Sequence, residues 1–182
     1  MLNETWKKLQ NGSDIRGVAM EGVEGQPVNL TPEIAKQIAC SFGAWLSERT
    51  GKLLSELTVA VGNDSRLSAG ELNGAVTQGL SMLGITVVDC GLCSTPAMFM
   101  TTVMEGYRYD GSVMLTASHL PFNRNGLKFF TKDGGLEKSD ITAILELAQE
   151  KIYTKAGKPG AIKSLDFIQV YAADLVRKIR NK

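Results

Sequence analysis

Short apolar runs alternate with amphipathic helical segments between residues 31 and 151, and this alternation leaves the chain few possible folds. Thr31 is a suitable N-cap, Pro32 follows it in the first helical turn, and apolar residues then recur with helical spacing. The runs LTVAVG (57–62) and ITVVDC (85–90) are each typical of a buried strand. Strands that alternate with helices predict a layered α/β domain.

Further helices continue the pattern. Between the two strands, Ser68 and Glu71 match the S-x-x-E capping box of a helix that Gly84 closes. Pro96 marks the start of a short helix, and residues 139–151 have the apolar spacing of another. These helices extend the layered α/β pattern to residue 151.

Two more strands are expected at 112–117 (SVMLTA) and 127–131 (LKFFT), joined by a short polar segment. A parallel pair needs a crossover of about a dozen residues or more, so this pair is expected to be antiparallel. The other strands are separated by helices, which favours parallel pairing. We therefore predict a mixed, mainly parallel sheet.

The composition changes after Lys151. The segment YTKAGKPGAIKS is rich in glycine and lysine and contains a proline, which is typical of a linker. The following run LDFIQVYAADLVRKI predicts an amphipathic helix over 165–179, whose apolar face has no evident partner upstream. We therefore predict a first domain at residues 1–152, and a linker with the first helix of a truncated second domain at 153–182.

The charge balance argues against polyanionic partners. Twenty Lys and Arg residues face 19 Asp and Glu, a net charge of +1, so no overall field would recruit nucleic acid or an anionic membrane. No apolar run reaches the roughly 20 residues of a membrane helix, and no secretory signal is present. Three cysteines do not form a disulfide framework. A cytoplasmic location is expected.

Cys90 and Cys93 have the C-x-x-C spacing of a thioredoxin-type redox pair and lie between a strand and a helix. A thiol oxidoreductase is therefore one hypothesis. The spacing alone is a weak signal, and a zinc site would need further ligands, for which Cys40 and His119 are the only other cysteine and histidine. A structural role for the cysteines is favoured.

Two polar turns hold candidate phosphate-binding or loop-bracing residues. In VGNDSRLSAGE (61–71), Asp64 and Arg66 follow a strand and precede a helix N-terminus, which can hold an anion. A charge-assisted Asp64–Arg66 pair that braces a neighbouring loop is favoured over anion binding, and plain turn chemistry stays open. In SDIRG, Arg16 could clamp a phosphate bidentately or be one more surface arginine.

The segment LTASHLPFNRNGLKFF (115–130) brings Ser118 to a strand end, where α/β sheets present their ligands. A hydrolase pair of Ser118 and His119 is disfavoured, because neighbours on an extended backbone point to opposite sides and no G-x-S-x-G elbow is present. A phosphorylated serine is the favoured chemistry. Its charge of about −1.5 to −2 could be surrounded by Lys128, Arg16, His119 and asparagine amides.

Taken together, these motifs resemble those of the α-D-phosphohexomutases, the family that includes phosphoglucomutase and phosphomannomutase. TASHLPFNRNGLKFF resembles the family's serine loop, T-A-S-H-N-P followed by N-G-x-K, with Leu120 in place of the usual asparagine. SDIRG, VGNDSR and CSTPAMF resemble its D-I-R-G, V-G-x-D-x-R and T-P segments, in the same order. The resemblance covers residues 13 to 150 and implies the family's domain I fold, a three-layer α/β/α domain with a mixed, mainly parallel sheet.

The resemblance implies reversible transfer of phosphate between C1 and C6 of a hexose phosphate, through phosphorylated Ser118 and a hexose bisphosphate. It implies acid/base or charge-stabilising work for Lys128 and Arg16, and a positioning role for His119. Three further residues are expected to support the phosphate loop: Asp64, Arg66 and Asn125. Glucose, mannose and glucosamine phosphates are not distinguished.

The resemblance also implies Mg²⁺, held by Ser118 through its phosphate. The family's D-G-D-G-D-R loop, which supplies the other metal ligands, is absent, as are its later sugar-selecting and phosphate-binding loops. The chain is therefore expected to be the N-terminal domain of a longer intramolecular phosphotransferase, inactive without the remaining domains of the same polypeptide. A stand-alone phosphosugar-binding module without catalysis is the alternative.

Overall fold

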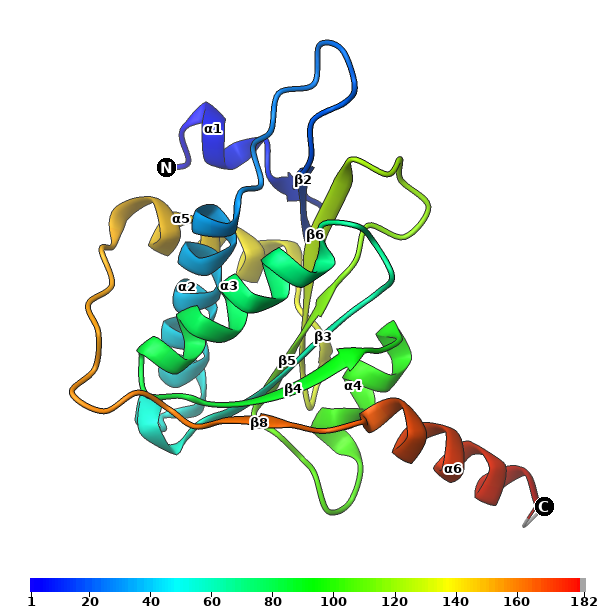
Figure 1. Cartoon of the computed structure of the whole chain (residues 1–182). Coiled ribbons are helices and arrows are strands. Elements are labelled where there is room, and N and C mark those ends of the chain that lie inside the picture. Colours follow the sequence, from blue (N-terminus) through cyan, green and yellow to red (C-terminus); the bar gives the residue numbers. More distant parts are fainter. Residues whose placement is uncertain (181–182) are drawn as a thin grey trace.

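An eight-stranded mixed sheet lies between two layers of helices in the computed structural model, which describes residues 1–180 (Figure 1). The order across the sheet is β1-β2-β6-β5-β3-β4-β8, and β7 pairs with β6. The strands are Gln10–Asn11 (β1), Asp14–Val18 (β2), Thr58–Asn63 (β3), Thr86–Leu92 (β4), Gly111–Leu115 (β5), Arg124–Thr131 (β6), Gly134–Gly135 (β7) and Ile162–Ser164 (β8).

Most of these strands run in one direction. β3 pairs in parallel with β4 and β5, and β4 pairs in parallel with β8. β6 is antiparallel to both β5 and β2, so β2 runs with the parallel group, whereas β6 and β1 run against it. The predicted mixed, mainly parallel sheet is confirmed, as is the antiparallel pair on either side of the serine loop.

Helices cover both faces of the sheet. They are Glu4–Lys7 (α1), Pro32–Thr50 (α2), Ala69–Met82 (α3), Thr95–Val103 (α4), Lys138–Glu150 (α5) and Phe167–Arg180 (α6), with a short 3₁₀ turn at Leu54–Glu56 (η1). Figure 1 shows α2, α3 and α5 on one face and α4 on the other. The three-layer prediction is therefore confirmed.

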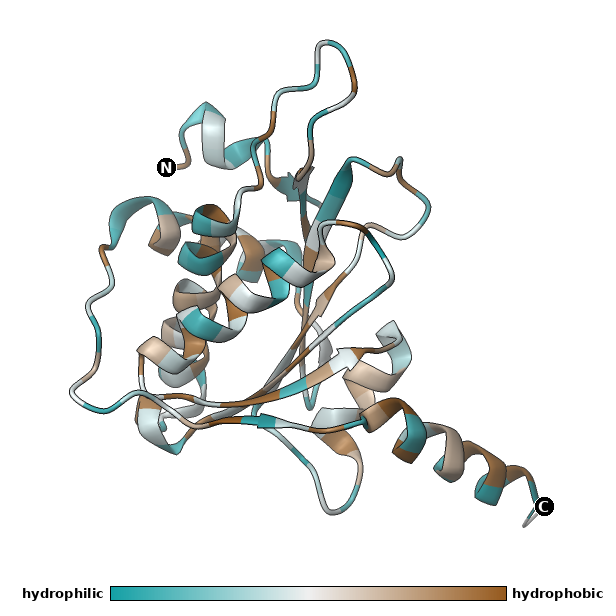
Figure 2. Cartoon of the chain, in the orientation of Figure 1, coloured by the Kyte–Doolittle hydropathy of each residue, from teal (hydrophilic) through white to brown (hydrophobic). Residues whose placement is uncertain are grey.

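The central strands are apolar because both of their faces are buried. Along β5, Val113 and Leu115 face the larger cluster under α2, α3 and α5, whereas Met114 faces the smaller cluster beside α4. Figure 2 shows these strands as largely hydrophobic. α4 and the first residues of α6 cover only part of this face, and polar side chains of β2 and β6 lie on the remainder: Asp14, Arg16 and Lys128.

Local caps were predicted with mixed success. Thr31 accepts the N–H of Ile34 at 3.3 Å, and Gly51 ends α2 with a φ of 69°. The predicted capping box of α3 is wrong, because Ser68 has helical backbone angles and its side chain accepts no helix N–H. Its hydroxyl instead accepts the side-chain N–H of Asn125 at 2.9 Å, which ties the helix to β6.

The segment after α5 differs from the predicted linker. Residues 162–164 form β8 on the edge of the sheet beside β4, and Gly160 N–H donates to the carbonyl of Ser81 at 2.8 Å. Sequence patterns missed β8 because all three of its residues are exposed, which removes the alternation that marks a strand. The boundary at residue 152 stays a prediction.

The C-terminal helix has a partner at its start, contrary to expectation. Phe167 is fully buried, with its ring 5.0 Å from that of Tyr107. Farther along α6, Leu175, Val176 and Ile179 remain exposed. Within residues 1–180, no helix combines the length and apolar character needed to cross a bilayer.

Candidate functional site

The serine loop, residues 116–123, leaves the carboxyl end of the central strand β5 and exposes Ser118 at its tip. Ser118 has a φ of 54°, a left-handed conformation that is uncommon for residues other than glycine. Its N–H donates to Oγ1 of Thr116 at 3.0 Å. Such a conformation costs about 1–3 kcal/mol and persists only where the surroundings enforce it.

The left-handed turn at Ser118 differs from the extended backbone that the sequence predicted. On an extended backbone, Ser118 and His119 would point to opposite sides. In the structure, Oγ of Ser118 lies 3.4 Å from Nδ1 of His119, at the long end of the hydrogen-bonding range. Within residues 1–180 no carboxylate pairs with His119, so a serine hydrolase triad still has no third member.

Arg66 holds the serine loop in shape. Its guanidinium donates to four backbone carbonyls, those of Ser118 (2.8 Å), Leu120 (2.8 Å), Pro121 (2.9 Å) and Arg124 (3.0 Å). Asp64 orients the arginine, with Oδ2 3.5 Å from Nε and Oδ1 accepting the backbone N–H of Arg66. A planar group with five donors can bridge several carbonyls that a lysine could not.

Arg66 donates to the backbone carbonyl of Leu120, so this hydrogen bond does not depend on which side chain stands at position 120. A leucine in place of the family's usual asparagine is therefore compatible with the clamp.

Two further contacts support the loop at its second end. Asn125 is fully buried and donates to Ser68, so it acts as an anchor inside the protein rather than a surface contact. Gln26, on the long connection between β2 and α2, accepts from both Asn123 and Arg124. Sequence reasoning missed Gln26, because a polar residue in an irregular connection carries no local signal of its partner.

Arg16 and Lys128 lie on neighbouring strands β2 and β6. Arg16 donates to the carbonyl of Ala117, the residue before Ser118, at 2.9 Å. Both cations contact Asp14, through Arg16 Nη2 at 3.1 Å and Lys128 Nζ at 2.7 Å. Sequence reasoning gave Asp14 no role beyond its place in SDIRG. The i, i+2 spacing that places two strand residues on one face was a usable signal for pairing it with Arg16.

The cysteines do not form a reactive site. Cys90 and Cys93 are buried free thiols, and burial raises the pKa of Cys90 to about 12 and also raises the pKa of Cys93. Thiolates are the reactive species, so these groups are inert at neutral pH. Over the described residues, no group of three or more His, Cys, Asp or Glu is placed to hold a metal ion.

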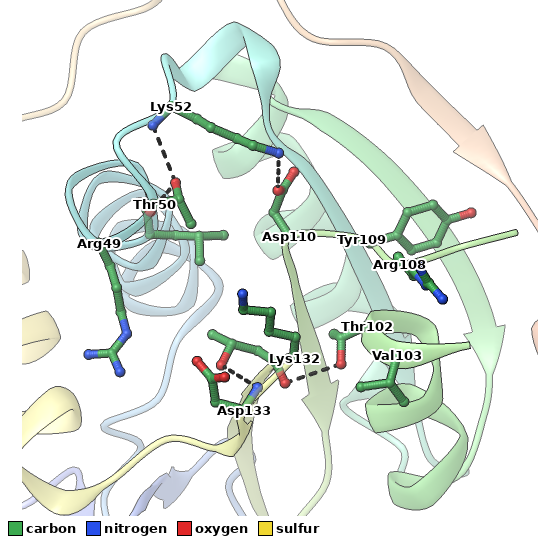
Figure 3. Close-up of a pocket in the computed structure, with 12 residues that line it drawn as sticks. Arg49, Thr50, Lys52, Thr102, Val103, Arg108, Tyr109, Asp110, Lys132 and Asp133 are labelled. Carbon is green, nitrogen blue, oxygen red and sulfur yellow. Dashed lines mark hydrogen bonds and ion pairs between the residues drawn. The ribbon is translucent and has the colours of Figure 1, made fainter. Parts of the chain in front are cut away.

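A cavity of about 770 Å³ lies at the opposite end of β5, beside Asp110 (Figure 3). Its basic residues include Arg49 and Lys52 at the C-terminus of α2, where the helix dipole favours cations. Lys52 pairs with Asp110 at 2.6 Å, and Arg49 and Arg108 lie on opposite sides of the cavity. These charges are therefore explained by local structure and do not converge on one point.

Asp110 has two partners at this end of the sheet. Besides pairing with Lys52, it accepts the backbone N–H of Thr58 at 2.9 Å. Replacing Asp110 by Ala is expected to lower the free energy of unfolding by about 1–3 kcal/mol, because that N–H loses its partner. Asp110→Asn keeps an acceptor and is expected to cost about 1 kcal/mol or less. Urea denaturation measures both, and equal losses would contradict this account.

The fold and the loop define an α/β/α domain that presents a clamped serine at the carboxyl edge of its sheet. The model for domain I of phosphoglucomutase/phosphomannomutase, described as an alpha/beta/alpha domain, matches residues 7–155. The chain therefore belongs to the phosphoglucomutase/phosphomannomutase family, as its motifs indicated.

Similar proteins carry several mutase names. A phosphoglucosamine mutase of Nautilia profundicola is 40% identical over 63% of this chain and 24% of its own length. A phosphoglucomutase/phosphomannomutase of Thermococcus kodakarensis is 32% identical over 96% of this chain and 36% of its own. The crystal structure of a family protein from Burkholderia thailandensis has a TM-score of 0.75 at 26% identity, covering 97% of this chain and 36% of that one. The chain thus spans about a quarter to just over a third of the length of these relatives.

Proposed function

We propose that Ser118 is the phosphate-carrying serine of a phosphohexomutase reaction, in which phosphate moves between C1 and C6 of a hexose phosphate. One observation carries the proposal: an exposed serine, in a strained left-handed conformation, lies at the tip of a loop whose carbonyls are held by four bonds from Arg66. Such a loop presents one hydroxyl to a ligand in a preorganised position, which is what phosphoryl transfer requires.

The proposed transfer breaks one P–O bond and forms another. The bond between phosphorus and Oγ of phosphorylated Ser118 breaks, and the new bond forms to the free hydroxyl at C1 or C6 of the hexose phosphate. The proton of that hydroxyl ends on Oγ of Ser118. The product is a hexose bisphosphate. It reorients in the site so that its other phosphate faces Ser118, and that phosphate returns to Ser118 by the reverse step.

The cations of β2 and β6 have the chemistry that this step needs. Charge accumulates on the equatorial oxygens of the transferring group, and fixed positive charge stabilises it. We assign that role to Lys128 and Arg16, with Lys128 also available for proton transfer. His119, beside Oγ of Ser118, would contact the phosphate once it is attached.

The described residues alone do not fit Mg²⁺, because they include no cluster of carboxylates at the loop. Mg²⁺ thus stays a prediction from the family resemblance, with the phosphate on Ser118 as the one ligand this part of the chain would provide; a bound ion would neutralise part of the phosphate charge. The sugar is also open, because the relatives' names include glucosamine and mannose phosphate mutases.

Phosphate labelling tests the proposal. The protein, expressed from its own gene, is incubated with Mg²⁺ and ³²P-labelled hexose 1,6-bisphosphate, digested and mapped by mass spectrometry. Label is expected on the peptide that contains Ser118. Ser118→Ala should take up none, whereas Ser65→Ala, in a neighbouring exposed turn, should label like the parent.

Label on another residue, or unchanged labelling of Ser118→Ala, would reject the proposal. Saturable binding of the bisphosphate with no label on any variant would favour the stand-alone binding module instead.

A further inference from the structure

Two rows of residues cross strands β2, β6 and β5 on the face beside α4. In the antiparallel register, Arg16 lies opposite Gly126. Continuing this register by two residues brings Asp14 to Lys128, and their side chains are hydrogen-bonded at 2.7 Å. On the other side of β6, Met114 lies opposite Lys128, and the N–H of Thr116 donates to the carbonyl of Gly126. The row of Arg16 and Gly126 ends at Thr116, where the serine loop begins. The row of Asp14 and Lys128 ends at Met114, in the smaller apolar cluster.

Gly126 lets Arg16 reach that loop. A Cβ at Gly126 would lie 3.0 Å from Cγ of Arg16, so the absence of a side chain leaves room for the arginine to cross β6. Its Nη1 can then donate to the carbonyl of Ala117, next to Ser118. The position of the guanidinium is therefore coupled directly to the backbone of the serine loop.

Asp14 is shared by both cations. Oδ2 accepts from Arg16 at 3.1 Å, and Oδ1 accepts from Lys128 at 2.7 Å. The side chain of Asp14 is 15% exposed and that of Lys128 28% exposed, so both bonds lie at the margin of the protein. Lys128 also lies over the ring of Phe130, 5.8 Å from its centroid, which further restricts its ammonium group.

We propose that Asp14 is a positioning residue of the transfer site, which fixes Arg16 and Lys128 relative to Ser118 and acts only through them. This inference rests on the proposed function. A carboxylate beside a phosphate site repels the anion, so orientation of the two cations is what explains its place there. One carboxylate between two cations leaves a local charge of +1, and Lys128 retains donors beyond the one that Asp14 accepts.

Asp14→Asn removes the negative charge of the carboxylate. Asparagine has one side-chain oxygen, so only one of the two cations, Arg16 or Lys128, can keep its hydrogen bond to residue 14. In the protein expressed from its own gene, kcat for hexose phosphate isomerisation is expected to fall by about 100-fold, the cost of small misplacements at a reacting centre. KM is expected to change by less than about threefold, because Asp14 does not touch the substrate. Asp14→Glu keeps the charge and is expected to recover most of the lost kcat.

Asp110→Asn is the matched control. Asp110 has a similar exposure (14%) and a similar bond to a lysine (2.6 Å), but it lies at the opposite end of the sheet. Its kcat is expected to match the parent, and urea denaturation should show similar small losses of stability for both asparagine variants. If the loss of kcat in Asp14→Asn merely follows its unfolded fraction, the inference is wrong.

A second measurement is independent of activity. In ¹H–¹⁵N spectra of the 182-residue chain, hydrogen bonding to a carboxylate slows exchange of a lysine ammonium group. Asp14→Asn is expected to remove the Lys128 ammonium signal and to shift the Arg16 side-chain signals, whereas Asp110→Asn removes only the Lys52 signal. An unchanged Lys128 signal in Asp14→Asn would overturn the inference.

The two hypotheses fail in different ways. If Ser118→Ala is inactive but Asp14→Asn has the parental kcat, only the positioning role is lost. If Ser118→Ala is fully active, the proposed function fails, and with it the positioning role of Asp14 in phosphate transfer, while the ammonium spectra still report whether Asp14 holds Lys128.

Discussion

Replacing Arg66 by alanine is expected to lower the free energy of unfolding by about 2–4 kcal/mol and to disorder the serine loop. The variant loses four bonds from a charged donor to carbonyls between Ser118 and Arg124. Bonds from charged groups are worth about 1.5–3 kcal/mol each when buried, and water partly replaces those to exposed carbonyls. Urea denaturation measures the stability, and amide hydrogen exchange of residues 116–123 reports the loop.

Two variants make this result specific. Arg66→Lys keeps the charge, but an ammonium group cannot span four carbonyls, so at least half of the loss is expected to remain. Arg49→Ala removes an arginine that is 52% exposed and stacks on Trp45, and is expected to cost about 1 kcal/mol or less. Equal stability of Arg66→Ala and Arg49→Ala would show that the clamp contributes little.

Gly126→Ala is expected to cost about 3 kcal/mol or more, or to prevent folding. The new Cβ would clash with the carbonyl oxygen of Ile15 and would lie 3.0 Å from the carbonyl oxygen of Thr116. These two carbonyls belong to the backbone on either side of Gly126, so β2 and the end of β5 would both have to move away from β6. The same shift would displace Arg16, so any folded fraction is expected to transfer phosphate slowly.

Gly70→Ala is the control for this substitution. Gly70 is exposed in the first turn of α3, and a methyl group added there would have no neighbouring atom within 4 Å. Alanine is expected to leave stability within about 1 kcal/mol of the parent, on the stabilising side, since alanine favours helix. Thermal melting of both variants gives the comparison, and a parental Tm for Gly126→Ala would contradict the packing described for the strands.

Local patterns predicted those elements whose stabilising contacts are themselves local. The cap of α2 at Thr31 is set by residues three positions apart, and Gly51 ends the helix by its own backbone freedom. The capping box at Ser68 failed because its hydroxyl bonds to Asn125, 57 residues away. A distant partner of this kind leaves no trace in a window of a few residues.

The candidate site shows the same division. The motifs around Ser118, Arg66 and Arg16 could be found by eye, and the turn that brings Ser118 beside His119 could not. That turn depends on carbonyls gathered by Arg66, which belongs to a different loop. An extended backbone was the reasonable local assumption, and the tertiary contact overrode it.

The sequence by itself predicted the order of the main strands and helices between residues 31 and 151, the layered α/β architecture and the residues that mark a phosphohexomutase serine loop, but not the outer strands β1, β2 and β8. The tertiary structure decided which of those residues meet. Insertion of β6 between β2 and β5 places Asp14 beside Lys128, 114 positions away, and brings Arg16 to the carbonyl of Ala117, 101 positions away. Periodicity reports which face of an element is buried, whereas the order of strands in a sheet follows from the packing of the whole chain.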